Sequence, residues 1–326
     1  MREKIVWLEI HDPEVVKMED SILPAGFELV RPTSRTDTEE HLRLVADADY
    51  IIAGGIPVPR EYIQAAKKLK MIQKWGIGVD KIDCVAAEEQ GIPVYITAGA
   101  NSIPVAELAV GLMFAVNRKI PYVDATMRAG QWVKSKMRAQ CQMIHGKTIG
   151  LLGIGNIAKE VAKMLRGFEN TQVIYYDVIR LSPEDEEKYQ ATYVPFEELL
   201  RRSDILSIHV PLLTSTKHMV DAEQLAQMKS DAILINTARG GVVNEQALTE
   251  ALKAGRLRGA GLDSFEQEPI DPNNELLTLE NVVLTCHCGG GVSDNVLHVT
   301  EHAFSNIEKF SKGEPLNPKD HFVVKK

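Results

Sequence analysis

Short apolar runs alternate with amphipathic stretches along almost the whole chain, and this alternation limits the possible folds more than any other feature. Most runs are rich in Ile, Val, Leu or Tyr, as buried strands are, and the stretches between them have helical spacing. Alternation of this kind predicts parallel sheets of the α/β class. The predicted strands are Lys4–Ile10, Tyr50–Ala53, Met71–Trp75, Val94–Thr97, Thr148–Leu152, Val173–Tyr176, Ile205–Val210, Ile233–Asn236, Gly261–Phe265 and Val282–Thr285. The clearest predicted helices are Val105–Val116, Ile157–Leu165, Asn244–Lys253 and Asn295–Phe310.

The length of 326 residues favours two domains, because a single hydrophobic core rarely grows so large. Two glycine-containing segments, Thr97–Asn101 and Cys288–Val292, each precede a long predicted helix and are candidate crossings between domains. An ordinary turn explains the second glycine run equally well. The segment after Val292 is too short for a domain, so we expect it to pack on the N-terminal part.

Composition excludes several classes of protein. A hydrophobic fraction of 44% and a charged fraction of 25% are typical of soluble globular chains. The net charge of −8 argues against a nucleic-acid partner, and no apolar run reaches the roughly 20 residues of a membrane helix. The N-terminus lacks the apolar core of a signal peptide, and four cysteines make no disulfide framework. We therefore expect a cytoplasmic protein.

Two cysteines, Cys286 and Cys288, flank His287 and raise the possibility of a metal site. On an extended segment, neighbouring side chains point to opposite faces and cannot all reach one ion. We therefore predict no metal site and interpret both cysteines as small apolar residues packed near a functional histidine.

The strongest local motif runs from Gly146 to Ala158, from a predicted strand through a glycine turn into a helix. Gly153 suits the tight turn, and Gly155 lets the backbone approach a pyrophosphate. Ala158 stands where a small residue allows the helix to pack on the strand. The phosphates of a dinucleotide would then meet the free N–H groups at the helix N-terminus.

Asp177 ends the next strand, near the offset of about 20 residues at which an acid binds the adenosine ribose. Its carboxylate would accept hydrogen bonds from the ribose hydroxyls and repel a 2′-phosphate, so NAD is favoured over NADP. Arg180 lies close enough to weaken this preference, and a solvated acid at a strand end is the simpler alternative for Asp177.

Three ionisable residues follow apolar strands after this motif: Arg239, Glu268 and His287. Ligands of open α/β sheets bind outside the carboxyl ends of the strands. A planar guanidinium can hold the carboxylate and carbonyl of a 2-oxo acid, and a histidine can donate a proton near neutral pH. A carboxylate behind the histidine orients it and stabilises the imidazolium. Each residue alone has a structural explanation, but the three together, downstream of a dinucleotide motif, favour a functional site for this chemistry.

The chain resembles the D-isomer-specific 2-hydroxyacid dehydrogenases, a family that includes short phosphoglycerate dehydrogenases and glyoxylate/hydroxypyruvate reductases. The resemblance covers nearly the whole chain and rests on several blocks in the right order. These blocks are Gly76–Asp83, Asn101 through Val105–Glu107, Gly146–Ala158, His209–Leu212, Asn236–Gly240, Leu262–Pro269 and His287.

The resemblance implies two doubly wound parallel-sheet domains, with a Rossmann NAD-binding domain inserted in a flavodoxin-like substrate domain. The implied substrate domain is residues 1–99 plus 291–326, and the implied NAD-binding domain is residues 100–290. A homodimer and a D-configured product are also implied. Arg239, Glu268 and His287 fall on the family's catalytic positions. The implied substrate contacts are Ile77, Gly78, Asn101 and Gly54, and the implied cofactor contacts are Gly153, Gly155, Asn156, Ile157, Asp177, Pro211, Thr237, Ala238, Arg239, Asp263 and His287.

Three positions depart from the family pattern. Cys286 replaces a proline, and Ala158 replaces the third glycine of the dinucleotide motif. Gly54 stands where phosphoglycerate dehydrogenases tend to carry an arginine, so a substrate phosphate would lack its guanidinium partner. We therefore expect a small, non-phosphorylated substrate.

Two alternative functions share this scaffold. One is an NAD-sensing corepressor that binds partner peptides and turns over poorly; the sequence does not exclude it. The other is a formate-type dehydrogenase, which tends to carry Gln where this chain has Glu268.

Overall fold

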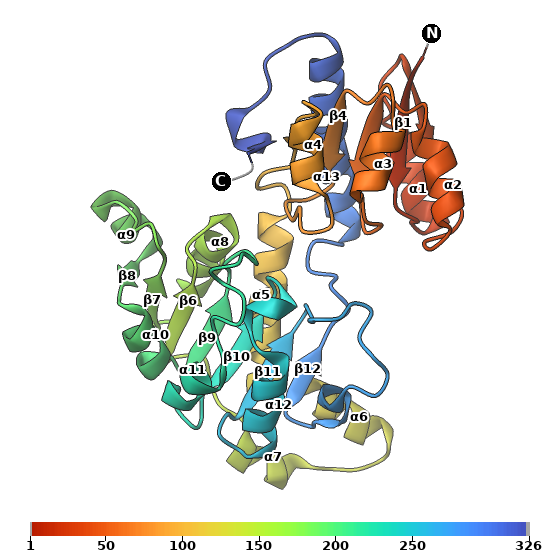
Figure 1. The fold of residues 1–326 in the computed structure, drawn as a ribbon. Helices are drawn as coiled ribbons and strands as arrows, with labels where there is room; N and C mark the ends of the chain where they lie inside the picture. Colours follow the sequence, from red (N-terminus) through yellow and green to blue (C-terminus); the bar gives the residue numbers. More distant parts are fainter. Residues whose placement is uncertain (1, 324–326) are drawn as a thin grey trace. The chain divides into compact units, whose positions relative to one another are not determined.

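The structure is a computed structural model that describes residues 2–323, and it divides into two compact units (Figure 1). The first unit contains the chain up to Asn101 together with the chain from Gly290 onward, and the second runs from Ser102 to Gly289. Each unit has its own sheet and its own hydrophobic core.

Within the described residues of the first unit, six strands form one sheet in the order β13-β5-β4-β3-β1-β2. The five strands β1 to β5 are parallel in the flavodoxin-like order, and β13 joins the edge antiparallel to β5. The strands are β1 (Glu3–Leu8), β2 (Phe27–Val30), β3 (Tyr50–Ala53), β4 (Met71–Lys74), β5 (Val94–Tyr95) and β13 (His321–Phe322).

Helices cover both faces of this sheet. Val6 and Leu8 of β1 face the core beneath α2, α3 and α4, whereas Ile5 and Trp7 face Phe304 of α13, because successive residues of a strand point to opposite faces. The last long helix also packs on α1 and β4. The bounds are α1 (Pro13–Asp20), α2 (Thr38–Val45), α3 (Arg60–Ala65), α4 (Cys84–Glu89), α13 (Ser293–Ser311) and the 3₁₀ turn η3 (Pro318–Asp320).

In the second unit, all of which is described, seven parallel strands form a sheet in the order β12-β11-β10-β9-β6-β7-β8. From β8 through β6 to β11 this is the Rossmann order, with β12 added at the edge. The strands are β6 (Thr148–Leu152), β7 (Gln172–Tyr176), β8 (Ala191–Tyr193), β9 (Ile205–Ile208), β10 (Ile233–Asn236), β11 (Gly259–Leu262) and β12 (Val282–Leu284).

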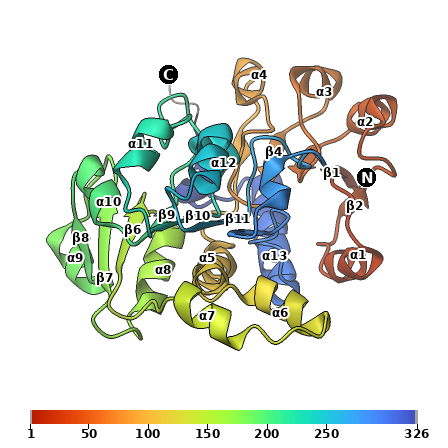
Figure 2. The same cartoon turned by 90° about the horizontal axis from the view of Figure 1, so that it is seen from below.

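Figure 2 shows α5 and α8 on one face of this sheet and α10, α11 and α12 on the other. The long helix α5 is apolar on most of its surface and packs against α8, β10 and β11. The bounds are α5 (Ser102–Asn117), α6 (Ile120–Arg128), α7 (Lys134–Gln140), α8 (Asn156–Leu165), α9 (Pro183–Tyr189), α10 (Phe196–Arg202), α11 (Ala222–Gln227) and α12 (Glu245–Lys253), with 3₁₀ turns η1 (Gly240–Val242) and η2 (Glu275–Thr278).

The predicted α/β class with two doubly wound sheets is confirmed. The strands predicted at Tyr50–Ala53, Thr148–Leu152 and Ile233–Asn236 have the predicted bounds. The strand predicted at Gly261–Phe265 was misplaced, since β11 begins at Gly259 and ends before Asp263. A Cβ at Gly259 would lie 2.9 Å from Val116 Cγ1 of α5, so close packing requires glycine there and removes the apolar signal from the strand. Strands β2, β8 and β13 were not predicted.

Between residues 2 and 323, no helix is long and apolar enough to cross a membrane.

Candidate active site

The glycine turn between β6 and α8 has the conformation that a dinucleotide site requires. Gly153 has a φ of 92°, and a Cβ there would lie 2.9 Å from the carbonyl carbon of His209. Its N–H donates to the Tyr176 carbonyl at 2.8 Å. Both the left-handed conformation and the close backbone approach therefore require glycine at this position.

The N-terminus of α8 offers free N–H groups. Gly155 is the N-cap residue and forms no side-chain cap, and a Cβ placed on it would meet nothing within 4 Å. The first helical residues, Asn156 and Ile157, thus begin beside open space, where a phosphate can accept hydrogen bonds from the helix end. Ala158 is fully buried in the core against the sheet, as its small side chain predicts.

Asp177 follows β7 and holds the glycine turn. One of its carboxylate oxygens accepts a hydrogen bond from the Ile154 N–H at 2.9 Å, and the other accepts one from the Ile179 N–H at 3.0 Å. The sequence interpretation offered a ribose contact or a solvated strand-end acid for Asp177 and missed this bracing role. Asp177 therefore shapes the glycine turn between β6 and α8.

The residues after β10 include an unpaired buried hydroxyl. Thr237 is 7% exposed, and its Oγ1 has no hydrogen-bond partner within residues 2–323. A buried hydroxyl without a partner is unfavourable unless a ligand or water satisfies it. Together with the glycine turn, this hydroxyl fits a bound dinucleotide. Pro211, after β9, accepts a hydrogen bond from Thr216 Oγ1 through its carbonyl at 2.6 Å.

Asn236 braces the loop that carries Arg239. Its side-chain oxygen accepts from the Ala238 N–H at 3.0 Å, and its amide nitrogen donates to the Arg239 carbonyl at 2.9 Å. The guanidinium of Arg239 donates to the Ala238 carbonyl at 2.7 Å. Gly240 permits the close approach of the Phe265 backbone, since a Cβ on it would lie 2.0 Å from the Phe265 carbonyl carbon. We had not assigned a role to Asn236, although it begins the block Asn236–Gly240.

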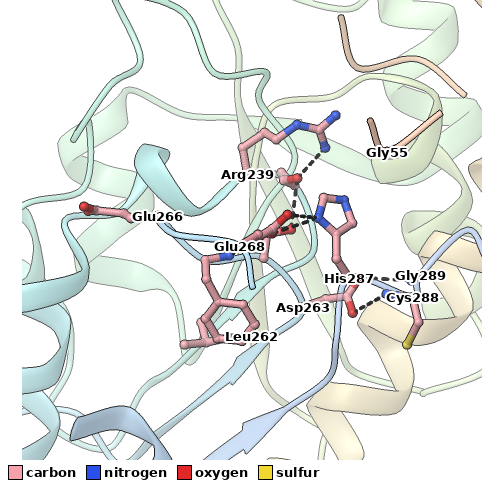
Figure 3. Close-up of polar contacts among 12 residues, drawn as sticks. Gly55, Arg239, Leu262, Asp263, Glu266, Glu268, His287, Cys288 and Gly289 are labelled. Carbon is pink, nitrogen blue, oxygen red and sulfur yellow. Dashed lines mark hydrogen bonds and ion pairs between the residues drawn. The ribbon is translucent and has the colours of Figure 1, made fainter. Parts of the chain in front are cut away.

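Glu268 and His287 form a pair in the loops after β11 and β12 (Figure 3). His287 Nδ1 lies 2.8 Å from each carboxylate oxygen of Glu268. Since an ionised carboxylate only accepts, Nδ1 carries the donated proton and Nε2 is the nitrogen left for other chemistry. Glu268 Oε1 also accepts a hydrogen bond from the Phe265 N–H at 3.2 Å. The Glu268 side chain therefore contacts both the loop after β11 and the ring of His287.

The backbone at His287 is left-handed, with a φ of 53°. The expectation of an extended segment from Cys286 to Cys288 is therefore wrong at its central residue. A side chain other than glycine, Asn or Asp seldom adopts this conformation, and where it does the surrounding contacts hold it. Throughout residues 2–323, no group of three or more His, Cys, Asp or Glu side chains is arranged to hold a metal ion.

Asp263 supplies the contacts that hold this conformation. Its carboxylate, 1% exposed, accepts hydrogen bonds from the Thr285 hydroxyl at 2.6 Å, the Cys288 N–H at 2.9 Å and the Gly289 N–H at 3.0 Å. Figure 3 shows Asp263 beneath the His287 loop. The resemblance implied only a cofactor contact for this residue, so its structural role was missed.

Arg239, Glu268 and His287 thus follow three neighbouring strands, β10, β11 and β12, at the carboxyl edge of one parallel sheet. This is the edge at which open α/β sheets bind ligands. A guanidinium, a histidine proton donor and a carboxylate on that histidine together can bind an anionic carbonyl compound and exchange a proton with its oxygen.

The remaining predicted residues lie in the first unit. Gly54 directly follows β3, and Ile77 and Gly78 lie in the loop after β4. The Ile77 side chain is exposed. Asn101 ends the first unit, and its buried Oδ1 has no hydrogen-bond partner within the described chain.

The sequence matches one family model, "D-isomer specific 2-hydroxyacid dehydrogenase, NAD binding domain", over residues 110–289. Among curated relatives, the glyoxylate reductase of Thermococcus litoralis is 43% identical over 79% of this chain and 78% of its own length. The hydroxypyruvate reductase of Thermotoga maritima is 38% identical over 88% of this chain and 92% of its own length. The D-3-phosphoglycerate dehydrogenase of Methanocaldococcus jannaschii is 40% identical over 85% of this chain but only 52% of its own length, so the chain spans about half of that relative.

Solved structures resemble the whole chain. The NAD-dependent formate dehydrogenase of Staphylococcus aureus, solved with NAD, has a TM-score of 0.88 at 28% identity and covers 98% of this chain and 99% of its own. The D-mandelate dehydrogenase of Rhodotorula graminis has a TM-score of 0.84 at 29% identity over 99% of this chain and 98% of its own.

Proposed function

This chain belongs to the D-isomer-specific 2-hydroxyacid dehydrogenase family, which transfers a hydride between NAD(H) and a 2-hydroxy or 2-oxo acid, and we propose that Arg239, Glu268 and His287 carry out that reaction here. The observation that supports the assignment best is the contact of both Glu268 carboxylate oxygens with His287 Nδ1 at 2.8 Å. A carboxylate on one ring nitrogen is the arrangement that prepares the other nitrogen for proton transfer.

In this proposal His287 is the general acid of reduction and the general base of oxidation. Glu268 holds the imidazole through Nδ1, so Nε2 gives its proton to the carbonyl oxygen of a 2-oxo acid or takes one from the hydroxyl of a 2-hydroxy acid. The negative charge of Glu268 stabilises the imidazolium from which the proton departs. The left-handed backbone at His287, held by Asp263, sets the direction of the ring.

Arg239 is the proposed binding group for the substrate carboxylate and carbonyl. A guanidinium offers several N–H donors in one plane, which suits two oxygens at once. Asn236 fixes the backbone from which the side chain extends. In the first unit, the backbone N–H groups of Ile77 and Gly78 and the amide of Asn101 are the proposed further contacts to the substrate.

The cofactor is NAD(H). Gly153, Gly155, Asn156 and Ile157 would hold its pyrophosphate at the N-terminus of α8. Asp177 would bind the ribose hydroxyls and repel the 2′-phosphate of NADP. Pro211, Thr237, Ala238, Arg239, Asp263 and His287 are the other proposed contacts, of which Thr237 offers an unpaired buried hydroxyl. When bound, the nicotinamide supplies or accepts the hydride.

We assign residues 1–99 and 291–326 to the substrate domain and residues 100–290 to the NAD-binding domain. A homodimer in the cytoplasm that forms a D-configured product completes the proposal; the four free cysteines support a reducing compartment.

The proposed substrates are small, non-phosphorylated 2-oxo acids such as glyoxylate and hydroxypyruvate, in keeping with the names of the relatives from Thermococcus litoralis and Thermotoga maritima. The absence of a side chain at Gly54 supports this choice, since an incoming phosphate would find no guanidinium there.

An NADH-oxidation screen tests the proposal, with glyoxylate, hydroxypyruvate, pyruvate, bulkier 2-oxo acids and phosphohydroxypyruvate as substrates. We expect turnover of the small non-phosphorylated acids by the wild type and severe loss in a His287→Gln variant. NADH binding without turnover of any 2-oxo acid would instead support the corepressor-like alternative. A parallel assay of NAD reduction by formate tests the other alternative, and turnover of formate alone would support a formate-type enzyme.

A further inference from the structure

The sheet of the first unit has a topological switch point between β1 and β3. The chain proceeds from β1 outward to β2 on one side and through β3, β4 and β5 on the other. In sheets with this strand order, ligands bind in the crevice outside the carboxyl ends of the two central strands. The residues that follow β1 and β3, Glu9 and Gly54–Gly55, line that position.

Glu9 points into the switch point and is itself 8% exposed. Its Oε2 accepts a hydrogen bond from the Gly55 N–H, and its Oε1 accepts one from the Ile10 N–H at 2.9 Å. The same Oε1 lies 2.7 Å from Nη2 of Arg35. Two backbone donors and one guanidinium converging on a carboxylate have the composition of an anion-binding site.

Further positive charge surrounds this position. The Lys74 ammonium donates to the Gly54 carbonyl at 2.7 Å, and the Lys81 ammonium donates to the Gly55 carbonyl at 3.3 Å. With Arg35, three cationic side chains contact this loop or the Glu9 carboxylate. The Arg35 guanidinium and the Ile10 and Gly55 N–H groups would be the donors for a phosphate or carboxylate if Glu9 did not fill the position.

Glu9 also determines which residues the loop can contain. A Cβ on Gly54 would lie 2.5 Å from Glu9 Cβ, and one on Gly55 would lie 2.5 Å from Glu9 Oε2. Real Cβ atoms do not approach so closely, and the atoms they would meet are part of a fixed, hydrogen-bonded side chain. The loop is restricted to glycine because the side chain of Glu9 packs directly against its backbone.

We propose that Glu9 is a specificity-determining residue whose carboxylate fills an anion-binding position at the β1/β3 switch point, so that 2-oxo acids with a second anionic group are rejected and those with a neutral substituent are accepted. The proposal rests on the proposed function of the chain and extends it to substrate choice. A substrate phosphate could bind here only by displacing the Glu9 carboxylate, which already accepts the available hydrogen bonds. Until then, the negative charge of Glu9 would repel the phosphate.

Substitution of Glu9 by serine tests this directly, because Glu9→Ser removes the charge and opens the space. We expect the ratio of kcat/KM for phosphohydroxypyruvate to that for hydroxypyruvate to rise about tenfold or more, the factor that one charge-assisted contact is worth. We also expect the variant, without cofactor, to bind inorganic phosphate in calorimetry more tightly than the wild type does. The matched control is Glu39→Ser on α2, which removes the same charge from an exposed position and should change neither quantity.

A Glu9→Gln variant keeps the size of the side chain and removes only its charge. It should raise the same ratio by a smaller factor, and it decides the question if the serine variant does not fold. An unchanged ratio in the folded variants, together with phosphate binding equal to that of the wild type, would overturn the proposal. A wild-type enzyme that reduces no 2-oxo acid would refute the proposed function instead, and phosphate binding by the Glu9 variants would still report on the anion position.

Discussion

The N–H of Cys288 donates a 2.9 Å hydrogen bond to the carboxylate of Asp263, so the residue that follows His287 is fixed from the end of β11. The Gly289 N–H donates to the second oxygen of the same carboxylate. Two consecutive backbone donors on one buried carboxylate restrict the whole loop. The unusual backbone conformation of His287 therefore depends on a residue that does not need to touch the substrate.

The first prediction concerns this carboxylate. Asp263→Asn replaces one of the two acceptor oxygens by an N–H donor, which must then face a backbone N–H. We expect a loss of about 1–3 kcal/mol in the free energy of unfolding, the range for one buried group left unsatisfied, and a fall in kcat. Denaturant melts and steady-state kinetics measure the two effects. Wild-type stability in the variant would show that Asp263 does not hold the loop.

The sequence predicts most of the strands because they contain short runs rich in Ile, Val, Leu or Tyr. It predicts β11 poorly because α5 packs so closely against Gly259 and Gly261 that larger side chains do not fit there. The strand therefore has no run of large apolar residues. The edge strands β8 and β13 have three and two residues, too few for a period of two to be seen. Packing against a helix from elsewhere in the chain cannot be deduced from a local pattern.

The second prediction is a pH effect on stability at His209, in the loop after β9. Burial lowers the pKa of His209 to about 4, and its Nε2 lies 2.9 Å from the Ser207 hydroxyl. As the pH falls below about 6.5, this histidine takes up a proton in the unfolded chain but not in the folded chain. The free energy of unfolding should therefore be highest above that pH and fall as the pH drops toward 4.

His209→Gln should flatten this loss of stability between pH 6.5 and 4, whatever its effect at neutral pH. Thermal melts across the range measure the slope. The exposed His145 provides a control, since His145→Gln should leave the slope as it is. If stability falls as steeply between pH 6.5 and 4 in the His209→Gln variant as in the wild type, then His209 binds its proton as readily in the folded chain as in the unfolded chain.

The third prediction concerns cofactor choice. Asp177→Ser removes the charge that repels a 2′-phosphate, so the preference for NADH over NADPH in kcat/KM should narrow. The variant also loses the hydrogen bond to the Ile154 N–H, so binding of both cofactors should weaken. Glu184→Ser, an exposed acid on the neighbouring helix α9, is the control. If the ratio of the two kcat/KM values stays constant, Asp177 is not at the ribose.

The fourth prediction is that Arg239→Lys lowers kcat/KM more than a charge-conserving change would be expected to. Lysine is a point donor and cannot hold carboxylate and carbonyl with two parallel N–H groups. We expect a loss of about 2–4 kcal/mol in kcat/KM, the range for a lost charge-assisted or oxyanion contact. As a control, Arg256→Lys at an exposed position should leave kcat/KM unchanged. Near-wild-type kinetics for the Arg239→Lys variant would show that the Arg239 guanidinium does not bind the substrate.

For the active site, the sequence identifies side chains with a chemical role and misses those that position them. Arg239, Glu268 and His287 stand out because ionisable groups at apolar strand ends need an explanation. Asn236 and Asp263 act by hydrogen bonds to backbone groups two to twenty-six residues away, and such partners are known only once the loops are folded. The left-handed backbone of His287 likewise has no signal in residue type.

The fifth prediction tests the pairing of Glu268 with His287. Glu268→Gln keeps the shape of the side chain and an acceptor for the Nδ1 proton, but removes the negative charge that stabilises the imidazolium. The limb of the reduction profile that falls with rising pH should move to lower pH, because reduction needs protonated His287. Oxidation needs the neutral ring and should persist to lower pH than in the wild type.

The most direct measurement is therefore kcat/KM against pH, in both directions, for the wild type and Glu268→Gln, with a deuteride isotope effect to show that hydride transfer limits the rate. Glu266→Gln is the matched control, because the Glu266 carboxylate contacts His218 at 3.0 Å instead, and its profiles should match the wild type. We predict opposite consequences for the two directions in Glu268→Gln, whereas unfolding would depress both. Profiles whose limbs do not move, with hydride transfer rate-limiting, would contradict the assignment of Glu268 and His287 as the proton-transfer pair.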